Sequence, residues 1–466
     1  MKNIAIVYGR PPSPIQRTAI EELTKCLLEY MGVYPVCVSC EQKDGYADHR
    51  FIYIGTRESN PYIKEHTEGT LTIPESYSIR VKDDVVVIEG YDDAGVLYGV
   101  LDFYNQYLPA CEHPKGIRYP VNPFERETLP DFSHTSAPAV KERGLWTWGH
   151  VIYDYRGYLD NMMKLKMNSV IIWNDFAPVN GDEIVAYAHA RGIRVIWGFS
   201  WLWDTACSKV DVANLEGKSE EILAKYEAEY ASMRGDGIYF QTFTELKTDN
   251  IDGVLIAEAA TAFVNRTAAL FYEKYPDLEI RFGLHATSVK DRLSFIAQTD
   301  PRIRIVWEDA GAFPFAYVPT EVEDFEETKD FVRGITRLRG DGERFGAVTK
   351  GLICLDWRKF AHLRGPHHLG VSTERTKSEL AARRRSTWRY VQAYWLANAD
   401  KAQELLKEMA RQTDGDLCLF GLVEDGLFEE SIMYPVALYA EMLWDTETDI
   451  KELLSSVALR RYVTFA

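Results

Sequence analysis

From about residue 142 onward, the sequence repeats one pattern: a short apolar run, a few polar or aromatic residues, and then an amphipathic segment. We interpret the apolar runs as strands at residues 143–149, 169–175, 193–200, 238–244, 279–285, 303–308, 347–356 and 416–423. The segments with helical periodicity cover 155–167, 181–191, 219–233, 254–275, 288–298, 321–338 and 373–412. Eight such repeats predict a (β/α)8 TIM barrel. An open doubly wound sheet is the alternative, but no glycine-rich phosphate loop follows any strand.

The residues before this repeat have a different, mixed order. Strand patterns at 2–8, 35–40, 51–55, 76–81 and 85–88 alternate with helical patterns at 15–31 and 92–106. The next segment is rich in proline and lacks periodicity, which indicates a linker. The chain has 466 residues, which is more than a single hydrophobic core accommodates. We therefore expect a small α/β domain at 1–108, a linker at 109–140 and a barrel at 141–466.

Charge and composition narrow the classes of partner. The net charge of −17 disfavours nucleic acid and anionic lipid surfaces. No run approaches the ~20 apolar residues that cross a bilayer, and the N-terminus has no secretory pattern. Seven scattered cysteines suggest reduced thiols. We therefore expect a cytoplasmic protein with no nucleic-acid or membrane partner; the sequence leaves its oligomeric state open.

Active sites of such barrels lie at the carboxyl ends of the strands, and the predicted ends here are rich in aromatic and polar side chains. Tryptophan rings stack on the apolar C–H faces of sugars, although packing inside the barrel is the alternative explanation. The candidate substrate-binding residues at these ends are Trp148, His150, Trp173, Asn174, Asp175, Trp201, Gln241, His285, Trp307 and Trp357. The histidines show no H-x-H or H-E-x-x-H spacing, so we expect no metal.

Carboxylates also recur at these ends. Cleavage of a glycosidic bond needs a proton donor and a second carboxylate that acts as nucleophile or as base. Glu245, after the fourth strand, is the candidate acid. The second is Asp356, Asp309 or Glu308, and the last two cannot both point into the barrel because side chains alternate along a strand. Sequence leaves open both this choice and the retaining or inverting outcome.

Several segments resemble known families. Residues 90–102 (GYDDAGVLYGVLD), Arg143-Gly144, and residues 165–168 with Trp173 are similar to glycoside hydrolase families 20 (β-hexosaminidases) and 67 (α-glucuronidases). The resemblance implies a zincin-like small domain of the hexosaminidase N-terminal type, and it implies that Arg143 holds sugar hydroxyls. Family 20 has an Asp-Glu pair after the fourth strand, whereas this chain has Thr244 before Glu245. A single Glu is closer to the general acid of family 67.

These observations predict a glycoside hydrolase that cleaves O-glycosidic bonds of small oligosaccharides, hexosaminidase-like or glucuronidase-like, without any cofactor. A glucuronide would need a cation for its carboxylate, for which Arg143, Arg358 and Lys359 are available. The alternative from another class is a catalytically silent carbohydrate-binding barrel.

Overall fold

The computed structural model describes residues 3–83, 85–107, 131–203, 210–212, 215–286, 288–308, 324–340, 344–350, 352, 365–413, 415–423 and 428–466. The chain forms two compact units. The first comprises Met1–Pro138, His189–Gly192 and Leu459–Arg461, and the second comprises Ala139–Ala188, Ile193–Ala458 and Tyr462–Ala466.

The N-terminal unit contains a six-stranded mixed sheet with strand order β2-β1-β3-β5-β4-β6. Its strands are β1 (Ile4–Tyr8), β2 (Val36–Ser39), β3 (Arg50–Gly55), β4 (Tyr77–Lys82), β5 (Val85–Gly90) and β6 (Phe132–Ser136). Its helices are α1 (Pro14–Met31), α2 (Pro61–His66) and α3 (Asp93–Asp102). The side chains of Ser13 and Asp92 cap the first turns of α1 and α3.

Strand β6 corrects the predicted linker. It lies inside residues 109–140, yet it pairs antiparallel with β4 from Phe132↔Val81 to Ser136↔Tyr77. Its sequence, FSHTS, has only one apolar residue. An edge strand is held mainly by backbone hydrogen bonds to one neighbour, so it needs no apolar pattern that sequence analysis could detect.

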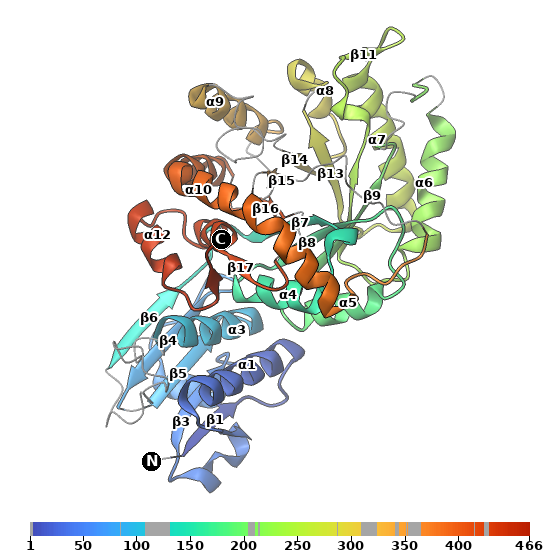
Figure 1. Cartoon of the computed structure of the whole chain (residues 1–466). Helices are drawn as coiled ribbons and strands as arrows, with labels where there is room; N and C mark the ends of the chain where they lie inside the picture. The colour runs from blue at the N-terminus through green and yellow to red at the C-terminus, as the bar shows by residue number, and fades with distance from the viewer. Residues whose placement is uncertain are drawn as a thin grey trace. The chain divides into compact units, whose positions relative to one another are not determined.

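The second unit is a closed barrel of eight parallel strands, which confirms the predicted fold class (Figure 1). The strands in chain order are β7 (Glu142–Trp148), β8 (Ser169–Trp173), β9 (Arg194–Ser200), β10 (Gly237–Gln241), β13 (Ile280–His285), β14 (Arg304–Glu308), β15 (Phe345–Thr349) and β16 (Cys418–Leu422). The last strand closes the barrel by pairing with the first, with Cys418 opposite Glu142. Strand β15 ends at Thr349, earlier than the predicted end at residue 356.

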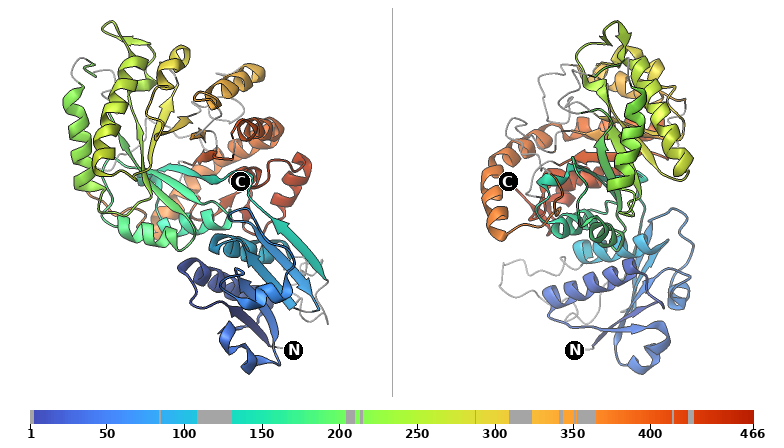
Figure 2. Two further views of the ribbon diagram at one scale, coloured as in Figure 1. Left: turned by 180° about the vertical axis from the view of Figure 1, so that it is seen from behind. Right: turned by 90° about the vertical axis from the view of Figure 1, so that its right-hand side faces the viewer.

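Helices cover the outside of the barrel. They are α4 (Tyr155–Lys164), α5 (Gly181–His189), α6 (Glu216–Glu229), α7 (Ile256–Lys274), α8 (Leu293–Ile296), α9 (Phe325–Thr336), α10 (Glu374–Gln412), α11 (Tyr434–Trp444) and α12 (Ile450–Ala458). Helix α6 packs against α7, and α10 packs against α9 and α11 (Figure 2). Helix α10 has a kink at Asn398, whose φ of −129° is not helical. Two pairs of short strands lie outside the barrel sheet. Strands β11 (Asn250–Ile251) and β12 (Val254–Leu255) pair antiparallel, and β17 (Ile432–Met433) and β18 (Val463–Thr464) pair parallel.

The amino-terminal end of the barrel is filled by charged side chains. The side chain of Arg281 is fully buried, and its guanidinium lies 2.7 Å from the Glu142 carboxylate and 2.6 Å from that of Glu279. Burial alone would raise the pKa of Glu142, but Arg281 and Arg194 outweigh it and lower that pKa to about 2. The ionised network therefore stabilises the amino-terminal end of the barrel.

Candidate active site

At the carboxyl end of the barrel, Glu308 is the centre of a buried polar network. It is the last residue of β14 and is 3% exposed. Its Oε1 accepts hydrogen bonds from the Tyr239 hydroxyl and the Gln241 amide, both on β10. Its Oε2 lies 3.1 Å from His285 Nε2 and 3.1 Å from Lys350 Nζ. Side chains from β10 and β13 and from the residue that follows β15 thus surround one carboxylate on β14.

The alternation of side chains explains why these residues meet. Tyr239 and Gln241 are two positions apart on β10, so both point into the barrel, as does His285 at the end of β13. Gly283 makes room for the tyrosine. A Cβ atom on Gly283 would lie 2.0 Å from the Tyr239 hydroxyl, so any other residue would displace that ring from Glu308.

The electrostatics of this network fix its protonation states. Burial would raise the pKa of Glu308, but the charges of His285 and Lys350, with hydrogen bonds from His285 and Tyr239, outweigh it and hold that pKa well below its usual range. Burial and the neighbouring Glu308 raise the pKa of Tyr239 well above its usual range. At neutral pH, Glu308 is therefore an anion and Tyr239 a hydrogen-bond donor, so Glu308 does not serve as a proton donor.

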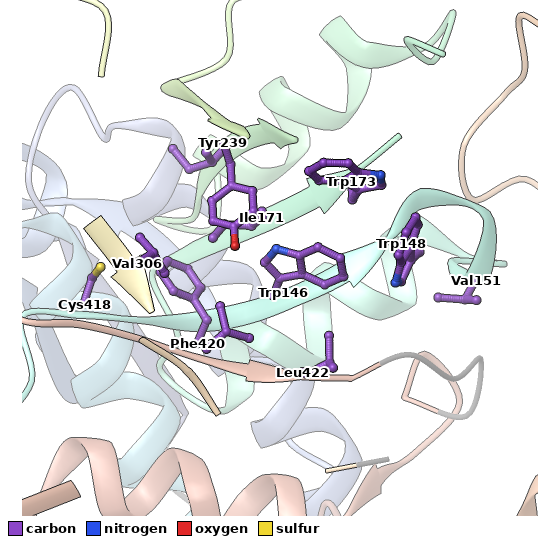
Figure 3. Close-up of a cluster of buried hydrophobic side chains, with 12 residues drawn as sticks. Trp146, Trp148, Val151, Ile171, Trp173, Tyr239, Val306, Cys418, Phe420 and Leu422 are labelled. Atoms are coloured by element: carbon purple, nitrogen blue, oxygen red, sulfur yellow. The ribbon is translucent and has the colours of Figure 1, made fainter. Parts of the chain in front are cut away.

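A cluster of tryptophans lies beside this network. Trp146 and Trp148 of β7 and Trp173 of β8 are buried and pack edge-to-face or stacked, with ring centroids 5.5–6.2 Å apart (Figure 3). Partly buried Trp203, after β9, lies 5.9 Å from Trp148 and 5.6 Å from Trp173. Trp146 also contacts Tyr239, at 6.2 Å. The aromatic cluster thus connects the polar network to the surface.

Glu245 lies at the edge of this cluster. It ends the 3-10 turn Phe243–Glu245 that follows β10, and it is exposed. The Trp203 indole donates a hydrogen bond of 2.5 Å to Glu245 Oε2. An exposed carboxylate that is oriented by an indole can reach a bound substrate and exchange protons with water, as a general acid must.

Other predicted residues lie near the cluster in different settings. His150 follows β7, and its ring centroid is 5.7 Å from that of Trp148. Asn174 is buried and donates to the Ile172 carbonyl at 3.1 Å. A Cβ atom on Gly149 would lie 2.0 Å from the Asn174 Oδ1, so a glycine at this position permits the packing. Asp175 is exposed.

The structure corrects three predicted positions. Arg143 lies near the start of β7, at the opposite end of the barrel, and donates to the carbonyls of Val140 and Lys166 at 2.7–3.1 Å. Trp201 stacks on Phe240, with centroids 3.8 Å apart, and also on Phe271 of α7. Trp307 precedes Glu308, so it points outward, where it contacts Phe331 of α9. All three side chains face helices or loops outside the barrel.

The predicted residues Asp309, Asp356 and Trp357 lie outside the described residues, as do Arg358 and Lys359. Tyr239 and Lys350 were missed by sequence analysis. The signal for Tyr239 was its position two residues before Gln241, on the same face. Lys350 directly follows β15, but the predicted strand continued past it.

Two further properties concern only the described part of the chain. No group of three or more His, Cys, Asp or Glu side chains there is placed to hold a metal ion. Among the helices of these ranges, none combines the length and the apolar character needed to cross a membrane.

Comparison with known proteins agrees with this architecture. Residues 2–103 match the model of the glycosyl hydrolase family 67 N-terminus. Comparison with curated protein sequences finds no match. A family GH115 4-O-methyl-α-glucuronidase with specificity for decorated arabinogalactans is similar over 98% of this chain, with a TM-score of 0.54 and 14% identity. This chain spans 58% of that protein's length.

Two other solved structures are similar. CpGH84B matches 98% of this chain and 70% of its own, with a TM-score of 0.57 and 12% identity. A β-N-acetylhexosaminidase from Bacteroides fragilis NCTC 9343 matches 100% of this chain and 93% of its own, with a TM-score of 0.53 and 13% identity. At these identities the likeness shows the fold. Together with the family 67 match over residues 2–103, this fold fits a distant relative of the two-domain glycoside hydrolases.

Proposed function

We propose that the protein is a glycoside hydrolase that cleaves an O-glycosidic bond in small oligosaccharides, with Glu245 as the general acid. The observation that carries this proposal is the position of Glu245: an exposed carboxylate after β10, hydrogen-bonded to Trp203 at the edge of a tryptophan cluster. A sugar that stacks on Trp203 would bring its glycosidic oxygen close to this carboxylate. Gln241, His285, Trp148 and Trp173 are the further candidates for holding the sugar.

Glu308 has a different role in this proposal. Its two oxygens already accept from or lie beside four donors, which matches the lone pairs of a carboxylate. A nucleophile needs a free lone pair, so we assign Glu308 to positioning Lys350 and His285 and to supplying negative charge near a developing oxocarbenium ion. Asp356 and Asp309 remain the candidates for nucleophile or base.

For the type of sugar, the glucuronidase-like alternative is favoured over the hexosaminidase-like one. Thr244, where family 20 has an Asp, is fully buried and carries no charge. Lys350, by contrast, brings a cation to the carboxyl end of the barrel, and its side chain is 12% exposed. A substrate carboxylate would gain from that cation, whereas Thr244 supplies no carboxylate to an acetamido group.

The test is a screen of nitrophenyl glycosides and natural disaccharides, with glucuronides, N-acetylhexosaminides and neutral hexosides in both anomers. We expect one class to be hydrolysed and Glu245→Gln to lower kcat on the disaccharide by at least ~10²-fold, as for loss of a general acid. Glu258→Gln, at an exposed position on α7, is the matched control. Sugar binding without hydrolysis would favour the silent carbohydrate-binding barrel. If the protein neither binds nor hydrolyses any of these sugars, both proposals are contradicted.

A further inference from the structure

The N-terminal unit has a cavity of its own. It has a volume of about 320 Å³ and opens between the C-terminal end of α2 and strands β4 and β5. This volume is at the lower end of the range of small-molecule sites in proteins, roughly 300–1,000 Å³. Within the part of the chain that the structure describes, the residues lining this cavity all lie between Glu65 and Val87, and none of them belongs to a barrel strand.

One side of this cavity is apolar and aromatic. Val85 and Val87 of β5 form it together with His66 of α2. The His66 ring stacks on Tyr53, with centroids 5.0 Å apart and planes inclined by 21°. Tyr53 in turn stacks on Tyr62 at 5.2 Å. The stacking fixes the orientation of the His66 ring, which therefore presents a rigid planar edge beside two aliphatic side chains.

The other side is polar and contains both donors and acceptors. Arg80 and Lys82 lie opposite Val87 and Val85 in the antiparallel register of β4 and β5, so their side chains share the face of the cavity. Arg80 donates to the His66 carbonyl at 2.9 Å, which holds its guanidinium at the rim. Glu65 and Glu68, both exposed, also line the cavity from the chain around α2.

The charges of the cavity select the kind of ligand. Three acidic residues, including Asp83, line the cavity together with two basic residues, so groups of both charges are present. Burial lowers the pKa of His66, so its ring adds no charge at neutral pH. An anion would meet the carboxylates and a cation the guanidinium. A neutral ligand with many hydroxyls can donate to the carboxylates, accept from Arg80 and Lys82, and place an apolar face on the valines.

We infer that this cavity is a second carbohydrate-binding site, which takes a neutral sugar unit and is separate from the proposed active site in the barrel. This inference goes beyond the proposed function and does not depend on catalysis. The site would hold a neutral unit of a glycan through the N-terminal unit alone.

The experiment is isothermal titration of the full chain carrying Glu245→Gln and Trp148→Ala, which prevents turnover and weakens the barrel site. The probes are xylotetraose, cellotetraose and chitotriose, with trigalacturonate as the anionic comparison. We expect at least one neutral probe to bind, and trigalacturonate to bind at least ~10-fold more weakly, equivalent to about 1.4 kcal/mol.

Variants of the cavity then locate the binding. Val85→Asp places a charge on the apolar side, and Glu65→Gln removes an acceptor from an exposed position; each should weaken binding by about 10-fold or more. Glu21→Gln, at an exposed position on α1, is the matched control and should leave the affinity unchanged. The inference is overturned if no neutral probe binds at about 10 mM, or if both cavity variants bind as tightly as the chain with an unchanged cavity. Because hydrolysis is not measured, that failure leaves the glycosidase proposal untouched.

Discussion

The ion pair between Lys350 and Glu308 gives the most direct test of the barrel network. Lys350 Nζ lies 3.1 Å from Glu308 Oε2, and the two side chains are 12% and 3% exposed. Removing one partner of a buried pair typically costs 3–5 kcal/mol, because the other charge stays buried. In Lys350→Met the carboxylate keeps its other donors, so we expect the low end of that range, about 3 kcal/mol.

Urea unfolding followed by tryptophan fluorescence is the assay. All 11 tryptophans follow residue 145, so this signal reports on the barrel and not on the N-terminal unit. Lys218→Met, which breaks the exposed pair of Lys218 with Glu221 on α6, is the matched control and should cost no more than about 0.5 kcal/mol. The double variant Lys350→Met/Glu308→Gln should recover at least about 1.5 kcal/mol relative to the sum of its single variants. If Lys350→Met is as mild as Lys218→Met, the network does not stabilise the barrel and our reasoning is wrong.

Three other predictions follow from single contacts. Gly283→Ala would place a Cβ 2.0 Å from the Tyr239 hydroxyl and should destabilise the barrel by about 1–3 kcal/mol, measured by the same unfolding assay; an unchanged urea midpoint would contradict this. Glu142 has a folded pKa of about 2, below its unfolded value near ~4.3, so its stabilisation is complete above pH ~4.3 and is lost as pH falls toward 2. Urea midpoints at pH 5 and pH 3 check this, and Glu142→Gln should show a smaller drop between them. Trp203→Phe removes the donor to Glu245 and should lower kcat/KM by about 10-fold on the best disaccharide. An unchanged kcat/KM would show that the hydrogen bond from the indole does not contribute to catalysis.

The barrel could be predicted from the sequence because its signal is a property of whole segments. Eight apolar strands alternate with amphipathic helices, and an error of two residues at the end of a strand leaves the number of strands unchanged. Even the weak eighth strand, predicted at 416–423, is present as Cys418–Leu422. Strand β6 was missed because an edge strand of mostly polar residues carries no such pattern.

The site depends on single residues, and there the sequence was less informative. Trp307 and Glu308 are neighbours on β14 and cannot both point inward, so only one of these two predicted site residues lies in the barrel. Arg143 was placed by resemblance, yet it lies at the start of β7, far along the strand from Trp148. Predicting the end of β15 too late put Lys350 inside a strand instead of at its end.

Closure of the barrel has a consequence for synthesis of the chain. The first strand, β7, finds one of its two neighbours only in β16, and the Thr147 side chain bonds the Val423 carbonyl, 276 residues away. A ribosome must therefore synthesise the chain beyond residue 418 before the open edges of β7 and β15 are paired. During that interval both edges are open to pairing with other chains, so nascent or truncated forms that end before residue 418 should require chaperones and aggregate readily.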